Sequence, residues 1–125
     1  MRIFDNALLY NPVSCTWIPS SFSVEKGKIK AVGKPGSLSG HLVFDLEGAR
    51  VIPGLIDVHS HGNSAADFSD GDYEGLKAMA RQYAAWGVTS FAPASMTLPY
   101  DVLEKAFATA KQLREEAPEG CARLM

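Results

Sequence analysis

The sequence predicts an α/β protein in which a small β unit precedes a parallel sheet covered by helices. Residues 1–50 form short β-like runs broken by turn residues, without a long stretch of helical period. From residue 51 onward, short apolar runs alternate with amphipathic segments in the order strand, helix, strand, helix, strand. This alternation is typical of parallel strands joined by right-handed crossovers.

The β unit is predicted to contain several short strands. Residues 2–10 open it as a strand, and residues 22–24 and 28–32 flank a turn at Glu25, Lys26 and Gly27. Gly27 can take the positive φ that a tight hairpin turn requires. Residues 34–40 are rich in Gly, Ser and Pro and predict a loop, and residues 41–46 alternate as a further strand.

The second part begins with a nearly continuous apolar run at residues 55–58, which predicts a strand buried on both faces of a parallel sheet. Residues 62–71 predict a loop, after which Asp70 or Asp72 can cap a helix that runs to about Trp86. Residues 88–93 predict a second strand, Pro99 begins a second helix, and residues 121–125 start another strand. The apolar stripes of the two helices are Leu76, Met79, Ala80 and Tyr83, and Leu103, Ala106, Phe107, Ala110 and Leu113.

Two parallel strands and the start of a third neither close a barrel nor complete an open sheet. We therefore expect the sequence to be the amino-terminal portion of a longer protein, with residues 1–50 as the β unit and residues 51–125 as the first units of an α/β domain.

Composition excludes several classes of function. The chain has 12 Lys and Arg against 14 Asp and Glu, so it lacks the basic excess of a nucleic-acid or anionic-membrane binder. The longest uncharged stretch, residues 6–24, contains Pro12 and Pro19 and does not predict a membrane span. Cys15 and Cys121 lie far apart, which is typical of a reducing compartment, and the amino terminus does not resemble a signal peptide. We expect a cytoplasmic protein without nucleic-acid or membrane partners.

The strongest local signal is a pair of histidines, His59 and His61, at the end of the first predicted parallel strand. A period of two residues would place Asp57 on the same face as both histidines. Neutral imidazole is the commonest metal ligand in proteins, and the carboxyl ends of parallel strands are where α/β folds gather their chemistry. The pattern predicts a metal site, the alternative being two histidines that only end the strand. Asp57 could be a third ligand or a residue that supports the other two.

The segment from Pro53 to His61 resembles the metal-dependent amidohydrolases, whose first barrel strand carries a Pro-Gly-hydrophobic-hydrophobic-Asp-x-His-x-His pattern. Residues 62–71 and 86–97, the latter with Gly-Val-Thr-Ser-Phe-x-Pro, narrow the resemblance to the N-acetylglucosamine-6-phosphate deacetylase family.

The resemblance implies a (β/α)8 TIM-type barrel preceded by a small β-sandwich, to which residues 1–50 contribute. It implies hydrolysis of the N-acetyl group of a sugar phosphate, with one or two divalent ions, zinc or iron, and a homodimer at full length. His59 and His61 match the positions that hold one metal, and the resemblance favours a supporting role for Asp57.

The family's other functional residues, a Glu ligand, two further His ligands and an Asp acid/base, are expected downstream of Met125. No catalytic residue is therefore predicted within residues 1–125, and we expect this portion alone to be inactive.

Alternative functions remain at this point. One is another amidohydrolase, acting on a cyclic amide or a nucleobase, and another is a non-catalytic barrel that serves as a scaffold. Asp67, Asp70 and Asp72 are better explained as caps and turn residues than as a cation site. Asn63, Ser64 and Ser95 lie in loops predicted at the catalytic mouth and have no assigned role.

Overall fold

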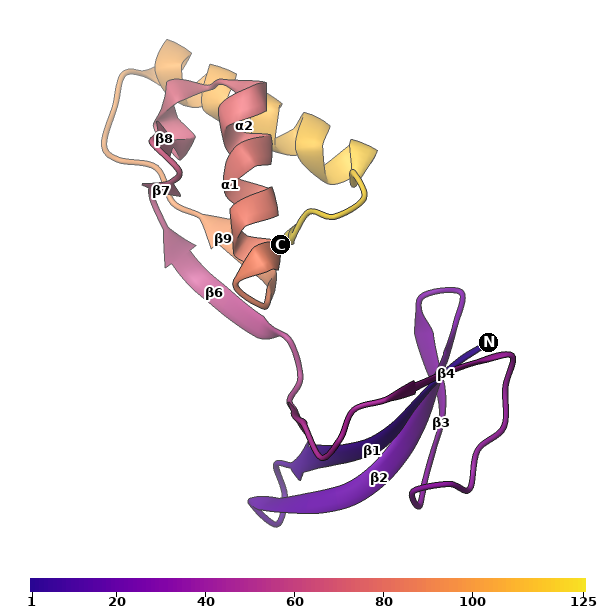
Figure 1. The fold of residues 1–125 in the computed structure, drawn as a ribbon. Coiled ribbons are helices and arrows are strands. Elements are labelled where there is room, and N and C mark those ends of the chain that lie inside the picture. Colours follow the sequence, from indigo (N-terminus) through magenta and orange to yellow (C-terminus); the bar gives the residue numbers. More distant parts are fainter. The chain divides into compact units, whose positions relative to one another are not determined.

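The computed structural model describes residues 1–125, which divide into two compact units, Met1–Pro53 and Gly54–Met125. Figure 1 shows the first unit in indigo to magenta and the second in pink to yellow. The division falls after Pro53 because the strand before it still pairs with the first strand of the chain. The assignment of the units to a sandwich and to a barrel stays a prediction.

The first unit is a five-stranded sheet with the order β3-β2-β1-β4, in which β5 also pairs with β1. The predicted hairpin is confirmed: β2 and β3 are antiparallel, and Lys26 and Gly27 in the turn both have positive φ, +49° and +72°. The second strand is longer than expected because it also forms a hairpin with β1. The strands are β1 Arg2–Asn11, β2 Thr16–Glu25, β3 Lys28–Gly33, β4 Leu42–Asp45 and β5 Arg50–Val51.

A single carboxylate fastens the predicted loop at residues 34–40 to the sheet. Asp5 Oδ1 accepts hydrogen bonds from the Gly36 N–H, the Asn6 N–H and the Ser21 hydroxyl. The Ser21 hydroxyl and the two N–H groups hold the pKa of Asp5 below its usual value, because they favour the charged form.

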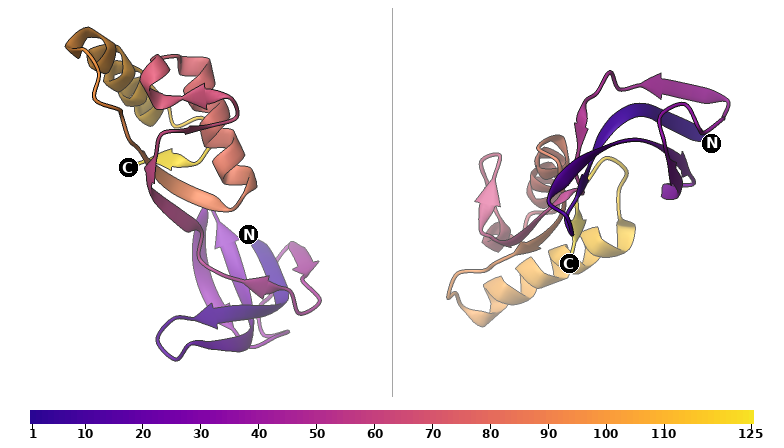
Figure 2. Two further views of the ribbon diagram at one scale, coloured as in Figure 1. Left: turned by 90° about the vertical axis from the view of Figure 1, so that its left-hand side faces the viewer. Right: turned by 90° about the horizontal axis from the view of Figure 1, so that it is seen from below.

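The second unit is built on a parallel three-stranded sheet with the order β10-β9-β6. Figure 2 shows β10, in yellow, beside β9. Its parallel strands and both helices follow the predicted order, and the unit is a mixed α/β structure. The elements are β6 Leu55–Ser60, β7 Gly62–Asn63, β8 Ala66–Asp67, the 3-10 helix η1 Phe68–Asp70, α1 Tyr73–Ala85, β9 Val88–Pro93, α2 Tyr100–Glu116 and β10 Arg123–Leu124.

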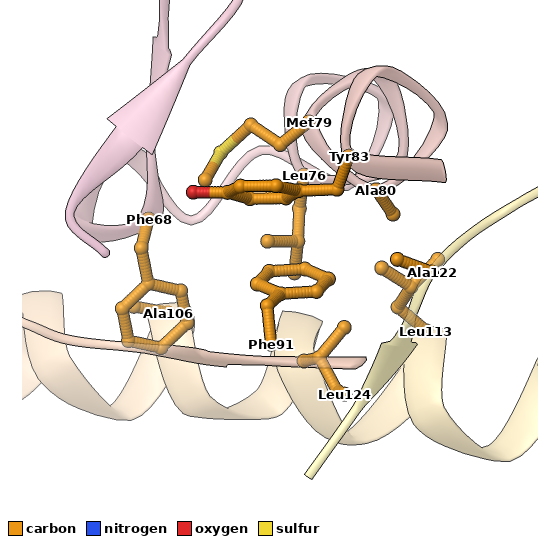
Figure 3. Close-up of a cluster of buried hydrophobic side chains, with 10 residues drawn as sticks. All are labelled: Phe68, Leu76, Met79, Ala80, Tyr83, Phe91, Ala106, Leu113, Ala122 and Leu124. Carbon is orange, nitrogen blue, oxygen red and sulfur yellow. The ribbon is translucent and has the colours of Figure 1, made fainter. Parts of the chain in front are cut away.

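The core of the second unit lies between the two helices and the sheet (Figure 3). Phe91, in the central strand, is fully buried, and its ring centroid lies 4.8 Å from that of Tyr83 on α1. The predicted stripe of α1 is confirmed. In α2 only part of the stripe is buried, and Phe107 is exposed. The buried members of the cluster are Phe68, Leu76, Met79, Ala80, Tyr83, Phe91, Ala106, Leu113, Ala122 and Leu124.

Two expectations for this unit were wrong. The run at residues 55–58 forms β6 as expected, but Leu55, Ile56 and Val58 are exposed rather than buried. The reason is that the buried cluster of this unit contains no residue of β6, so the apolar side chains of this edge strand stay outside the core. Residues 62–71 form the short β7–β8 hairpin and η1 rather than an unstructured loop.

The three aspartates that follow the histidine pair act as caps, as predicted. Asp67 and Asp70 form a capping box on η1, and Asp72 accepts the Glu74 and Gly75 N–H groups at the start of α1. Neither α1 nor α2 combines the length and the apolar character that crossing a membrane requires.

Candidate metal centre

The structure brings the two predicted ligands together at the carboxyl end of β6. The ring centroids of His59 and His61 lie 5.0 Å apart, and the rings meet edge to face at 86°. His59 is exposed and His61 is half-buried, so both rings can be reached from solvent. Two imidazoles at this separation can approach one divalent ion from different sides.

A hydrogen bond to the neighbouring strand fixes the tautomer of His61. His61 Nδ1 lies 2.8 Å from the carbonyl oxygen of Ala94, immediately after β9. Since a carbonyl oxygen only accepts, Nδ1 carries the proton, and Nε2 of the neutral ring keeps its lone pair free. Histidines that bind metals usually donate their second ring N–H to a partner of this kind, which orients the ring.

The predicted placement of Asp57 needs a correction, because β6 is irregular at this point. Asp57 pairs with Phe91 and Ser60 with Pro93, so β6 has one residue more than β9 in this interval. Such a bulge interrupts the period of two residues from which the sequence placed Asp57 beside the histidines. Asp57 Oδ1 instead accepts the main-chain N–H of His59 at 3.0 Å.

No group of three or more His, Cys, Asp or Glu side chains in the structure is arranged to hold a metal ion. The chain therefore supplies at most the two imidazoles of a site, whereas catalytic zinc sites use three protein ligands and a water. The two imidazoles fit a divalent ion that has further ligands besides them. The supporting role of Asp57 stays a prediction.

The main chain around the pair is held at several points. The Ser60 carbonyl accepts the Ala94 N–H at 2.8 Å, and the His61 carbonyl accepts the Phe68 N–H at 2.7 Å. Gly62 is needed between these anchors, since a Cβ there would lie 2.2 Å from the carbonyl oxygen of Ala66. The turn after the histidines thus closes so tightly that only glycine fits at position 62.

The loop residues without an assigned role lie on either side of this turn. Asn63 Nδ2 is buried without a hydrogen-bond partner, while Asn63 Oδ1 accepts the Ser64 hydroxyl at 2.8 Å. Ser64 and Ala65 both have positive φ, +54° and +59°, a conformation that costs non-glycine residues energy. Ser95 follows β9 in the adjacent loop.

The two cavities in the second unit lie away from the histidines. One, of about 560 Å³, is lined by residues at the end of α2 and in β10, among them Arg114, Glu119 and Arg123. The other, of about 320 Å³, lies between α2 and the ends of β9 and β10 and includes Phe107 and Met125. Neither of these two cavities is lined by His59 or His61.

Sequence analysis missed two partners of the histidine pair. The carbonyl of Ala94 belongs to the main chain and leaves no signal in the residue types. Ser60, between the histidines, accepts a hydrogen bond from the Tyr83 hydroxyl, although the sequence assigned Tyr83 only to the core. The only signal in the sequence for this hydrogen bond was a tyrosine within the apolar stripe of a helix, because a buried Tyr hydroxyl needs a partner.

No family model matches the chain. Over 96 residues, 77% of this chain, it is 29% identical to the N-acetylglucosamine-6-phosphate deacetylase of Vibrio furnissii. Over 63 residues, half of the chain, it is 38% identical to the adenine deaminase of Methanoregula boonei. The crystal structure of N-acetylglucosamine-6-phosphate deacetylase from Pasteurella multocida matches 89% of this chain with a TM-score of 0.79 at 24% identity.

The matches cover only part of the length of each relative. The chain spans 24% of the Vibrio furnissii deacetylase, 11% of the adenine deaminase and 30% of the Pasteurella multocida structure. The shared fold therefore covers the amino-terminal β unit and the first strands and helices that follow it.

Proposed function

Because this chain corresponds to the amino-terminal portion of an amidohydrolase-superfamily protein, we propose that the whole protein is a metal-dependent carbon–nitrogen hydrolase. The observation that carries the proposal is the pair His59 and His61, with the His61 tautomer fixed by Ala94 so that Nε2 keeps its lone pair free for a ligand. The remaining ligands and the acid/base group would come from the part of the protein that follows residue 125.

We further propose that the substrate is N-acetylglucosamine 6-phosphate, which the whole protein would convert to glucosamine 6-phosphate and acetate. The support is the similarity to deacetylases, which extends over 77% of the chain in the Vibrio furnissii relative. In this proposal a bound divalent ion would polarise the acetyl carbonyl and acidify a water molecule. His59 and His61 would hold that ion, and Ala94 would keep the His61 ring oriented.

A second candidate is an aminohydrolase of nucleobases. It is supported by the adenine deaminase relative, which is 38% identical over half of this chain. The histidine pair serves this reaction equally well, since it also requires a metal-activated water. The two candidates therefore differ in the substrate and not in the residues of this chain.

The test is a substrate panel on the purified whole protein with and without added zinc. We expect acetate release from N-acetylglucosamine 6-phosphate and no ammonia release from adenine. Turnover of adenine or of a cyclic amide, with none of the amino sugar, would refute the deacetylase proposal and keep the hydrolase class. Lack of turnover of all three by folded, zinc-loaded protein would refute the class.

The role of the pair is tested by the double variant His59→Asn/His61→Asn. We expect it to lose at least about 100-fold in turnover, because removing ligands should exceed the 10- to 100-fold cost typical of losing a supporting partner. His41→Asn is the matched control, since His41 is an exposed histidine of the first unit. Residues 1–125 alone are expected to show no turnover, because they hold no third ligand.

A further inference from the structure

A buried hydrogen bond lies directly behind the two histidines. Ser60 is the only residue of β6 that is buried, with 9% of its surface exposed, and it stands between His59 and His61 in the sequence. The Tyr83 hydroxyl, on α1, donates a hydrogen bond to Ser60 Oγ. Tyr83 itself is 6% exposed. The bond therefore links the middle of the histidine segment to the helix that covers it.

Packing alone does not explain a tyrosine at this position. The Tyr83 ring lies within the apolar cluster, over Phe91 and beside Met79, as Figure 3 shows. A phenylalanine would fill the same space without placing a hydroxyl in apolar surroundings, which is costly unless the hydroxyl is hydrogen-bonded. We therefore attribute the choice of tyrosine to the hydrogen bond by which its hydroxyl holds the Ser60 side chain.

This hydrogen bond bears on the direction in which the histidines point. The Ser60 side chain is buried against α1, whereas His59 before it is exposed and the rings of His59 and His61 lie together, with centroids 5.0 Å apart. Holding Ser60 toward α1 therefore helps to keep the two flanking imidazoles away from the helix and beside each other. The bulge between Asp57 and Ser60 interrupts the regular pairing of β6 with β9 just before the histidine segment, which is where an anchor would hold the strand. The extra residue of a bulge can move along its strand by one position. Each such move would exchange the side chains on the two faces of the strand.

We propose that Tyr83 is a positioning residue of the metal centre, which acts through Ser60 to keep both imidazoles on one side of β6. The inference rests on the proposed function, because it requires that the histidine pair bind a metal. A hydroxyl on the far side of the strand thereby determines whether two ligands converge on one ion or diverge.

The experiment measures zinc affinity in the whole protein by titration calorimetry, taking the binding component that is absent from His59→Asn/His61→Asn. We expect Tyr83→Phe to weaken this component by about 10-fold or more, the usual cost of losing a partner that orients a metal ligand. Tyr73→Phe is the matched control. Tyr73 is also on α1, but its hydroxyl donates to Glu116, so zinc affinity should stay within about twofold of the wild type.

A second variant separates positioning from folding stability. Tyr83→Phe leaves the Ser60 hydroxyl without its partner, and adding Ser60→Ala removes that hydroxyl too, so the double variant should regain metal-free stability. Its zinc affinity should remain low, and the visible spectrum of the cobalt-loaded protein should differ from that of the wild type.

Zinc affinity of Tyr83→Phe within twofold of the wild type would overturn the inference, and so would recovery of both stability and affinity in the double variant. If wild-type protein and His59→Asn/His61→Asn bind zinc identically, the proposed metal centre fails together with the inference. If only the Tyr83 variants behave like the wild type, the inference alone fails.

Discussion

Phe91 is the side chain on which the second unit should depend most. It lies in the central strand, has no exposed surface and contacts the Tyr83 ring. Burying a phenylalanine contributes about 1.5 to 3 kcal/mol, and the cavity left by Phe91→Ala brings the expected loss to about 3 to 5 kcal/mol. A unit of this size has roughly 4 to 11 kcal/mol of stability in total, so the variant should be close to unfolding.

The two tryptophans make this prediction measurable, because each unit contains one. Trp17 lies in β2 and Trp86 follows α1, so a Trp17→Phe background leaves fluorescence that reports on the second unit. Urea unfolding of Phe91→Ala in that background should show a midpoint far below that of the parent. Ile29→Ala is the control, since Ile29 is 65% exposed in the first unit and should not shift the Trp86 transition. A loss below about 1 kcal/mol for Phe91→Ala would refute the proposed core.

Three further changes follow from local structure. Ala117 ends α2 with φ +40°, so Ala117→Gly should stabilise the chain by about 1 kcal/mol, and an unchanged or lower melting temperature would contradict this. The hydrogen bonds to Asp5 lower its pKa, so their contribution to folding stability is present above the ordinary value of 3.8. This stability is lost as the pH falls through the lower pKa of the folded state. Acid titration followed by Trp17 fluorescence should show the loss, and Asp5→Asn should reduce it. The hydrogen bond to Glu116 raises the pKa of Tyr73 to about 12, so the stability it provides is present below pH 10 and is lost as the pH rises through 12. Glu116→Gln should lower the pKa of Tyr73, measured by ultraviolet absorbance in a pH titration.

Local sequence signals predicted both units well where one element decides its own structure. Asp72 caps α1, Gly27 takes the positive φ of a hairpin, and Leu76 and Met79 are buried, because capping, turn geometry and helical period are read from neighbouring residues.

The errors arose where structure depends on residues distant in the sequence. The exposure of Val58 depends on which elements pack over β6, and the apolar run cannot specify those elements. The bulge beside Asp57 depends on the register between β6 and β9, so the assumed alternation failed there. The two histidines were nevertheless found, since their spacing of two keeps the rings close.

The central claim is that His59 and His61 hold a divalent ion, and counting bound zinc tests it most directly. Whole protein and the His59→Asn/His61→Asn variant are dialysed to equilibrium against the same zinc concentration, and the zinc content of each is measured by mass spectrometry. The proposed centre predicts one ion fewer per chain in the variant, with the His41→Asn control equal to the wild type. Equal zinc content in the wild type and the double variant would contradict it.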